Sequence, residues 1–375
     1  MTRSTVRPKR FSQAKGNEGA ALKFYRGADV STADELEKKG ARFFDGGQEE
    51  DLFALLAKKS VNMIRLRIWN DPYDEDGNPY GGGTNDYDTT ARLARRAKEQ
   101  GMELLLDFHY SDFWADPGKQ FPPKAWRGLD LALLEAEVYG YTHGVVTRLI
   151  KEGLRPDMVQ VGNEITNGLL WDAGKLPDYE SMARLLRSGI SAVREADKSI
   201  NIMLQLDFGG NNELYRAWFD KALEHQLDFD IIGLSYYPYW HRTLDDLSYN
   251  MNDISARYNK DLIVVETAYG FTLETASGAK MVLEESVFKD YRPYPVTPEG
   301  QRDFLLELAR RIRAVPTGRG FVYWEPAWIP GSTWATKAGM RYIGVEGEEG
   351  SNWGNQALFD FSGNALPAWE AFRES

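Results

Sequence analysis

Short apolar runs rich in β-branched residues alternate with longer stretches of helical periodicity from residue 24 onward. This alternation predicts eight strands, each followed by an amphipathic helical segment. The predicted strands are 24–30, 61–69, 102–109, 157–164, 200–207, 229–236, 261–266 and 320–325. The predicted helices are 48–60, 87–101, 131–153, 179–197, 211–226, 244–259, 298–315 and 366–373.

Strict strand–helix alternation indicates a parallel sheet, and eight such units indicate a (β/α)8 TIM barrel of α/β class. A doubly wound open sheet is the alternative fold, but no GxGxxG turn follows the first strand. Long segments follow the third, seventh and eighth strands (110–130, 267–297 and 326–365), while the connections from helix to strand are short. In a barrel the loops after strands build the active face, so the extra length predicts walls around a cleft in one domain, 21–375.

Ionisable and aromatic residues gather where the predicted strands end. These positions hold Asp29, Arg65, Arg67, Asp107, His109, Asn163, Glu164, Asp207, Tyr236, Glu266, Trp324 and Glu325. A carboxylate at the end of an apolar strand is costly to bury unless it is paired or hydrogen-bonded. The pair Glu164 and Glu266, which ends the runs VGNE and LIVVE, therefore predicts a two-carboxylate active site of the kind that cleaves glycosidic bonds.

The neighbours of the two glutamates suggest different roles. Asn163 precedes Glu164 and could bind a sugar 2-hydroxyl, while Tyr236 is close to Glu266 in strand order and could donate to it. A salt bridge with a barrel arginine is the structural alternative for each glutamate. Arg65 and Arg67 share one face of their strand, so they either pair with Asp29 or Asp107, or hold the nucleophilic glutamate ionised.

Other chemistries find little support in the residue pattern. No two histidines have HxH or HExxH spacing, and neither a GxSxG elbow nor a phosphate-binding glycine loop is present. His109 lies between Asp107 and Asp112, and structural and functional interpretations of it are equally open. Nine of the eleven tryptophans fall in segments after strands, where they either pack or stack on sugars; Trp114, Trp171, Trp324, Trp328 and Trp353 are among them.

The composition limits the classes of molecule that the protein is expected to bind. The net charge of −11 argues against nucleic acid and anionic membranes, and no run of apolar residues is long enough to span a bilayer. We expect a monomer that acts on a neutral polysaccharide or oligosaccharide. The absence of cysteine excludes disulfides and thiolate chemistry. Residues 1–20 are polar and basic without an apolar core, so we expect a disordered tail rather than a signal peptide: a cytoplasmic protein as written, a secreted one if a leader is missing.

Several runs resemble glycoside hydrolase family 53, the arabinogalactan endo-β-1,4-galactanases. They are YRGADVS, NMIRLRIWNDP, LLLDFHYSDFWADPGKQ, VGNEITNGLLW, LSYYPYW, IVVETAYGF, YPVTPEGQ, YWEPAWIP and NQALFDFSGNALP, which together span about residues 24–370. The resemblance implies a retaining double displacement on β-1,4-galactan, a neutral side chain of pectin, with Glu164 as acid/base and Glu266 as nucleophile. It also implies that Arg65, His109, Asn163, Tyr236 and Trp324 surround the sugar ring at the point of cleavage.

The full predicted site adds substrate contacts from Asp107, Asp112, Trp114, Trp171, Trp328 and Trp353. Two positions depart from the family pattern. Gln205 stands where a histidine is expected, and the segment FTLETASGAKMVLEES lacks the closely spaced Asp and Asn residues of a calcium site. We therefore expect no metal and no cofactor, although bacterial relatives can bind calcium there.

Two alternatives stay open at this stage. The same barrel and carboxylates would serve a sister activity such as a mannanase or a glucanase. A carbohydrate-binding protein that has lost catalysis would keep the aromatic residues as well. Cleavage of galactan, mannan and glucan, and the effect of Glu266→Gln, discriminate among these functions.

Overall fold

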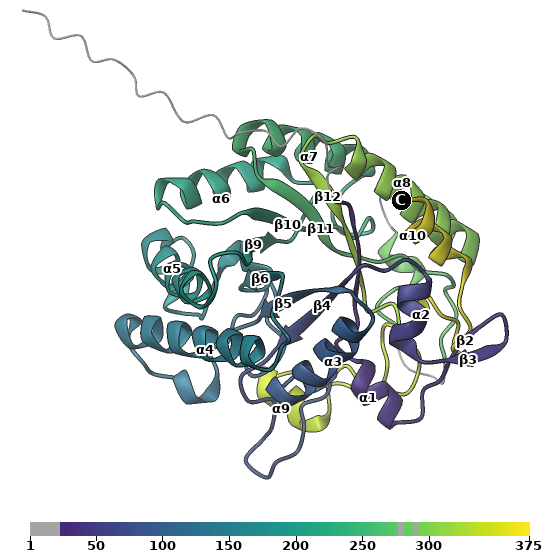
Figure 1. Cartoon of the computed structure of the whole chain (residues 1–375), viewed down its shortest axis with the longest axis horizontal. Helices are drawn as coiled ribbons and strands as arrows, with labels where there is room; N and C mark the ends of the chain where they lie inside the picture. The colour runs from purple at the N-terminus through teal and green to yellow at the C-terminus, as the bar shows by residue number, and fades with distance from the viewer. Residues whose placement is uncertain (1–22, 277–280, 289–290) are drawn as a thin grey trace, which may run out of the picture.

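The computed structural model describes residues 23–276, 281–288 and 291–375, and eight parallel strands form a closed barrel at its centre (Figure 1). Around the barrel the strands follow the order β1 (Tyr25–Asp29), β12 (Gly318–Trp324), β11 (Asp261–Thr267), β10 (Ile231–Ser235), β9 (Asn201–Leu206), β6 (Met158–Val161), β5 (Glu103–Phe108) and β4 (Met63–Ile68). Each corresponds to one predicted strand, so the (β/α)8 prediction is confirmed. The predicted tail at 1–20 lies outside the described residues.

Helices surround the barrel (Figure 1). The long ones are α3 (Tyr87–Glu99), α4 (Leu131–Lys151), α5 (Tyr179–Ala196), α6 (Asn212–Glu224), α7 (Leu244–Tyr258) and α8 (Pro298–Arg313). The shorter ones are α1 (Ala33–Lys38), α2 (Leu52–Lys58), α9 (Lys337–Ile343) and α10 (Glu370–Glu374). Most predicted helices agree within two residues. The start at residue 48 is wrong, because 48–50 belong to the hairpin of β2 (Phe43–Asp45) and β3 (Gln48–Glu50).

The barrel interior has an apolar layer below a polar one. The apolar layer takes a side chain from nearly every strand: Met63, Leu105, Met158, Met203, Ile231, Ile263, Val265 and Val322. Side chains two positions further along a strand point the same way, which brings Arg65, Asp107, Gln160 and Gln205 into the next layer. All four are buried. The strands therefore carry polar groups towards the end of the barrel at which they finish.

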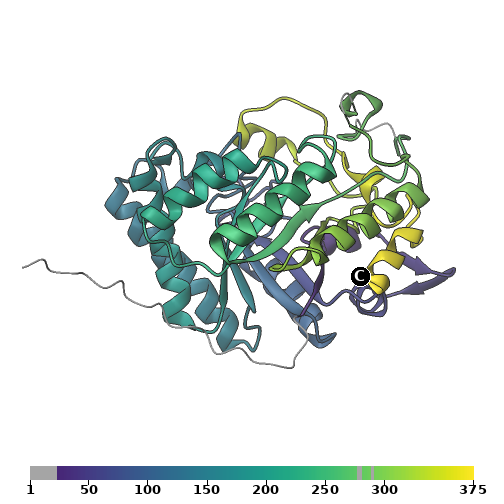
Figure 2. The same ribbon diagram turned by 90° about the horizontal axis from the view of Figure 1, so that it is seen from above.

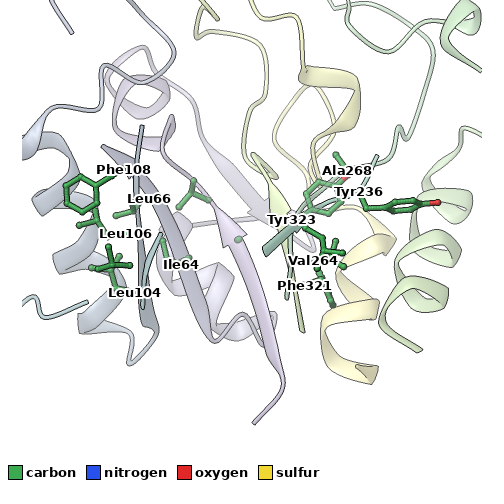
Figure 3. Close-up of a cluster of buried hydrophobic side chains, with 14 of the residues drawn as sticks. Ile64, Leu66, Leu104, Leu106, Phe108, Tyr236, Val264, Ala268, Phe321 and Tyr323 are labelled. Atoms are coloured by element: carbon green, nitrogen blue, oxygen red, sulfur yellow. The ribbon is translucent and has the colours of Figure 1, made fainter. Parts of the chain in front are cut away.

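The opposite faces of the strands are apolar and pack against the helices. Figure 3 shows this outer core, with Ile64 and Leu66 of β4 and Val264 of β11 among its members. Tyr236, which directly follows β10, points into this layer and away from the barrel axis (Figure 3). Apolar burial of this kind supplies most of the stability of a domain.

Strand β11 contains an extra residue next to Glu266. Leu234 pairs with Val264 but the next residue of β10, Ser235, pairs with Glu266; on the other side the same shift separates Val264 from Thr267. This irregularity is a β-bulge, which re-aims side chains at a strand end. As a result Val265 and Glu266 both point into the barrel although they are consecutive.

The long segments lie where the sequence predicts them. Figure 2 shows α9 and the loop after β11 projecting from the same end of the barrel. A small hairpin, β7 (Gly168–Leu169) and β8 (Gly174–Lys175), follows β6 on this side of the fold. Among the described residues, no helix is both long enough and apolar enough to cross a membrane.

Candidate active site

A cavity of about 400 Å³ opens at the carboxyl ends of the barrel strands, and both Glu164 and Glu266 line it. The other lining residues are His109, Trp114, Ala115, Asp116, Lys119, Asn163, Trp240, Val282, Trp324, Trp328, Trp334, Asn352 and Trp353. An adjoining cavity of about 270 Å³ shares both glutamates and adds Asp207, Tyr237 and His241. A larger hollow of about 730 Å³, beside Val282 and Trp334, contains neither glutamate. The chemistry therefore lies in the first two cavities.

Glu164 adopts an unusual backbone conformation just after β6. Its φ of 45° and ψ of 54° are left-handed, which is costly for a residue with a side chain and is often found at functional sites. Two contacts hold it there: its backbone N–H donates to Oε1 of Gln205 at 3.1 Å, and Ser235 Oγ donates to its Oε1 at 2.7 Å. Burial, the nearby Glu266 and the nearby Asp207 raise the pKa of Glu164 well above its usual value. Glu164 is thus suited to be protonated at the start of a reaction.

Glu266 has the opposite environment. Arg65 Nη2 lies 2.8 Å from its Oε1, Gln205 Nε2 donates to the same oxygen at 3.0 Å, and the hydroxyl of Tyr237 donates to Oε2 at 3.1 Å. Three donors, one of them a buried cation, stabilise a negative charge on this carboxylate and fix its orientation. The two glutamates therefore differ in the way that an acid and a nucleophile must differ.

Arg65 has both kinds of partner that the sequence suggested: buried aspartates and Glu266. Its Nη1 donates to Asp29 at 2.9 Å, and its Nη2 donates to Asp107 and to Oδ1 of Asn163, each at 2.9 Å, besides the contact to Glu266. The side chain is 1% exposed and lies beneath the cavity rather than on its surface. Arg65 therefore orients the side chains of Glu266 and Asn163, which lie above it.

Arg67 shares Asp29 with Arg65 but has different partners otherwise. It pairs with Glu325 at 2.7 Å and Asp29 at 3.4 Å, and its guanidinium lies 4.5 Å from the ring centroid of Trp114. Burial raises the pKa of Glu325 to about 7. These contacts support Trp114, which forms part of the cavity wall. Of the two arginines, Arg65 is the one that contacts Glu266.

Tryptophans form much of the wall. Trp324 and Trp353 meet edge to face with centroids 4.6 Å apart, and Trp114 lies parallel to Trp328 at 6.5 Å. All four were predicted to contact substrate, and the structure brings them to the same cavity. Flat apolar side chains in such a place suit the apolar faces of sugar rings.

Comparison with known proteins agrees with this geometry. The model of "Glycosyl hydrolase family 53" matches residues 25–372. The chain belongs to glycosyl hydrolase family 53. An uncharacterised protein of Niallia circulans is 43% identical over 93% of each chain, and the endo-beta-1,4-galactanase of Bacillus subtilis (strain 168) is 38% identical over 95% of this chain and 87% of its own. The family 53 catalytic domain of Ignisphaera aggregans superposes with a TM-score of 0.89 and 38% identity, covering 95% of this chain and 97% of that domain.

Within this family 53 site, Asn163 and His109 line the cavity but are already engaged. Asn163 Nδ2 donates to the carbonyl of Ala115 at 2.8 Å, which leaves its second N–H for a ligand. The ring of His109 is held at both nitrogens, since Nδ1 accepts from the N–H of Ala115 at 3.2 Å and Nε2 lies 3.2 Å from Asp107. These contacts indicate the tautomer with the proton on Nε2, directed at Asp107.

Five predicted contacts lie outside both cavity walls, and Arg65, described above, is one of them. Asp107 is fully buried below the cavity, and Asp112 is also fully buried, where it accepts from the backbone N–H groups of Asp71 at 3.0 Å and Lys124 at 2.7 Å. Tyr236 donates to the carbonyl of Arg242 in the outer core at 3.1 Å, so the prediction that it donates to Glu266 is wrong. Trp171, next to the β7–β8 hairpin under Lys175, is not part of either cavity wall.

The donor to Glu266 that the sequence interpretation missed is Tyr237. Strand β10 points Ile231 into the barrel, so strict alternation places Ser235 and Tyr237 on the inner side and Tyr236 on the outer one. Counting every second residue of β10 from Ile231, which lies in the apolar layer, would have placed Ser235 and Tyr237 inside the barrel. Asp116 and Lys119, which form an ion pair at the cavity, sit in a turn after β5 that alternation does not describe.

The described ranges contain no candidate metal site. There, no group of three or more His, Cys, Asp or Glu side chains is placed to hold a metal ion. The segment after β11, where calcium was considered, includes residues 277–280 and 289–290, which lie outside those ranges.

Proposed function

We propose that the protein is an endo-acting β-1,4-galactanase that cleaves β-1,4-galactan with retention of configuration. The observation that carries this proposal is the pair of glutamates that line one cavity in opposite electrostatic environments. Membership of family 53 supports the reaction, and the relative named endo-beta-1,4-galactanase supports the substrate.

In the first step Glu266 attacks the anomeric carbon while Glu164 donates its proton to the departing glycosidic oxygen. The bond between that carbon and oxygen breaks, and an ester between the sugar and Glu266 forms. Arg65 and Tyr237 hold the attacking carboxylate in one orientation. The raised pKa of Glu164 keeps its proton available until the leaving group needs it.

In the second step a water molecule replaces the leaving group. Glu164, now a carboxylate, accepts a proton from the water as its oxygen attacks the anomeric carbon, and the ester to Glu266 breaks. Two inversions restore the original configuration. The free N–H of Asn163 is the group we assign to the 2-hydroxyl of the reacting sugar, a contact that strengthens in the transition state.

The decisive experiment measures release of reducing ends from galactan, mannan and glucan by the wild-type protein and by Glu266→Gln. We expect galactan to be cleaved and the variant to lose activity by at least about 1000-fold, because the amide cannot form the ester. Proton NMR of the first products should show the β-anomer before mutarotation. Preferential cleavage of mannan or glucan would replace the substrate assignment, and unchanged galactan binding without turnover would favour a binding protein.

A matched pair of variants separates the two roles. Glu164→Gln should lose activity on galactan but retain formation of the ester from a 2,4-dinitrophenyl β-galactobioside, whose leaving group needs no proton. Glu266→Gln should lose both reactions. Equal behaviour of the two variants would contradict the assignment of roles.

A further inference from the structure

The side chain of Gln205 lies between the two catalytic glutamates. It projects from β9 and is fully buried. Its Nε2 donates to Ser235 Oγ at 2.9 Å and to Glu266 Oε1 at 3.0 Å, while its Oε1 accepts from the backbone N–H of Glu164 at 3.1 Å. Since a backbone N–H can only donate, the amide oxygen must face Glu164 and the amide nitrogen must face Ser235 and Glu266.

This orientation fixes the direction of the next hydrogen bond. Ser235 Oγ receives one amide proton from Gln205, and its single proton is then directed to Oε1 of Glu164, 2.7 Å away. Within the described part of the chain, Ser235 Oγ has no other acceptor, and Oε2 of Glu164 has no protein donor. Oε1 of Glu164 is therefore an acceptor, and Oε2 is the oxygen left to carry a proton.

We propose that Gln205 and Ser235 are positioning residues that place the acid proton of Glu164 on Oε2 and keep Oε1 as an acceptor throughout the reaction. The proposal rests on Glu164 being the acid/base of the proposed function. When Glu164 gives up its proton, the bond from Ser235 becomes charge-assisted and strengthens. Because this gain appears as the proton leaves, it lowers the barrier to bond cleavage more than it strengthens substrate binding.

Ser235 and the charged groups around Glu164 shift the pKa of Glu164 in opposite directions. Carboxylates face Glu164 from three other elements: Glu266 of β11, Asp207 after β9, and Asp116 after β5, which pairs with Lys119. These carboxylates raise the pKa of Glu164, whereas the hydrogen bond from Ser235 lowers it. Removing the Ser235 hydroxyl should therefore raise the pKa of Glu164 and make it a weaker acid.

The test compares Ser235→Ala with the wild type on two substrates. On galactan, whose leaving group needs a proton, we expect kcat/KM to fall roughly tenfold to a hundredfold, the range for a lost hydrogen bond to a charged group. On the 2,4-dinitrophenyl glycoside the change in ester formation should stay below about threefold, because no proton is needed. The alkaline limb of the pH profile of kcat/KM on galactan should move to higher pH.

Two controls separate positioning from folding. Ser235→Thr keeps a hydroxyl and should leave the alkaline limb where the wild type has it. Ser255→Ala removes another buried serine hydroxyl, which accepts from Thr317 at 2.9 Å outside the site, and should leave both substrates and the pH profile unchanged. Equal losses on both substrates by Ser235→Ala, or an alkaline limb that stays in place or moves to lower pH, would overturn the proposal.

The part played by Gln205 is tested by Gln205→Met. This variant removes the donor that orients Ser235 and also one donor to Glu266, so we expect losses on both substrates together with a displaced alkaline limb. Wild-type behaviour of Gln205→Met would overturn its role. Failure of the proposed function has a different signature, namely that Glu164→Gln still cleaves galactan at the wild-type rate.

Discussion

Arg65 Nη2 lies 2.8 Å from Glu266 Oε1, and this one guanidinium also bonds to two fully buried aspartates on neighbouring strands. The buried cation therefore balances several carboxylates at once. Its removal leaves charges without compensation in a medium of low polarity, which costs far more than the loss of a surface ion pair.

For Arg65→Met we expect the free energy of unfolding to fall by about 3–5 kcal/mol, the range for breaking a buried ion pair. Activity on galactan should fall as well, since Glu266 loses its cationic partner. The control is Arg257→Met, which breaks a half-exposed pair with Asp220 (2.7 Å) on the outside of the barrel and should cost about 0.2–1 kcal/mol. Urea denaturation measures both; similar losses in the two variants would contradict the assigned role.

Two adjacent tyrosines offer a direct test of strand parity. Tyr237→Phe removes the donor to Glu266 and should lower kcat by roughly tenfold to a hundredfold with little change in stability. Tyr236→Phe removes only the bond to the carbonyl of Arg242, so it should cost about 0.5–1.5 kcal/mol of unfolding free energy and leave kcat unchanged. The reverse pattern would return the donor role to Tyr236.

Asp207 should control the alkaline side of the pH profile. Burial raises its pKa to about 6, and its charge opposes ionisation of Glu164. Asp207→Asn removes that negative charge, which lowers the pKa of Glu164, so the acid loses its proton at lower pH. We expect the alkaline limb of kcat/KM on galactan to move to lower pH, opposite to the effect of Ser235→Ala. Asp220→Asn, outside the barrel, should leave the alkaline limb in place. A shift of the alkaline limb to higher pH in Asp207→Asn would contradict this prediction.

Asp112 is expected to matter for stability rather than for binding. Asp112→Asn places an amide where two backbone N–H groups need an acceptor, which should cost about 1–3 kcal/mol of unfolding free energy. The KM for galactan should stay within about threefold of the wild-type value, because Asp112 does not reach the cavity. A large rise in KM with unchanged stability would show that Asp112 contacts substrate after all.

The sequence predicted the barrel well because its strands are apolar on both faces and end in polar residues. Eight such runs leave few alternatives once they alternate with helices. The elements it missed are short: α1, α9 and the hairpin β7–β8 carry too few residues to establish a period. Their positions depend on contacts with other segments: β8 packs against α5, and the N–H of Thr336 before α9 donates to the carbonyl of Tyr80.

The site was predicted in outline but not in detail. Glu164, Glu266 and four of the five tryptophans line the cavities as expected. Gln205 could be noticed as a departure, but its contacts join residues up to 140 positions apart, and no local pattern contains them. Asp107 and Asp112 were assigned to substrate because they are charged and near a strand end, whereas burial makes them supports for other groups.

The bulge in β11 has a consequence for how this barrel tolerates change. Regular alternation would turn Glu266 to the side of Leu262 and Val264, into the apolar shell beneath the helices. The direction of the Glu266 side chain therefore depends on a count of residues: a strand without Val265 would be regular, would keep the pairing of Ser235 with Glu266, and would still turn Glu266 into the barrel. Apolar substitutions at Val265 should be tolerated, because its side chain packs in the apolar layer inside the barrel.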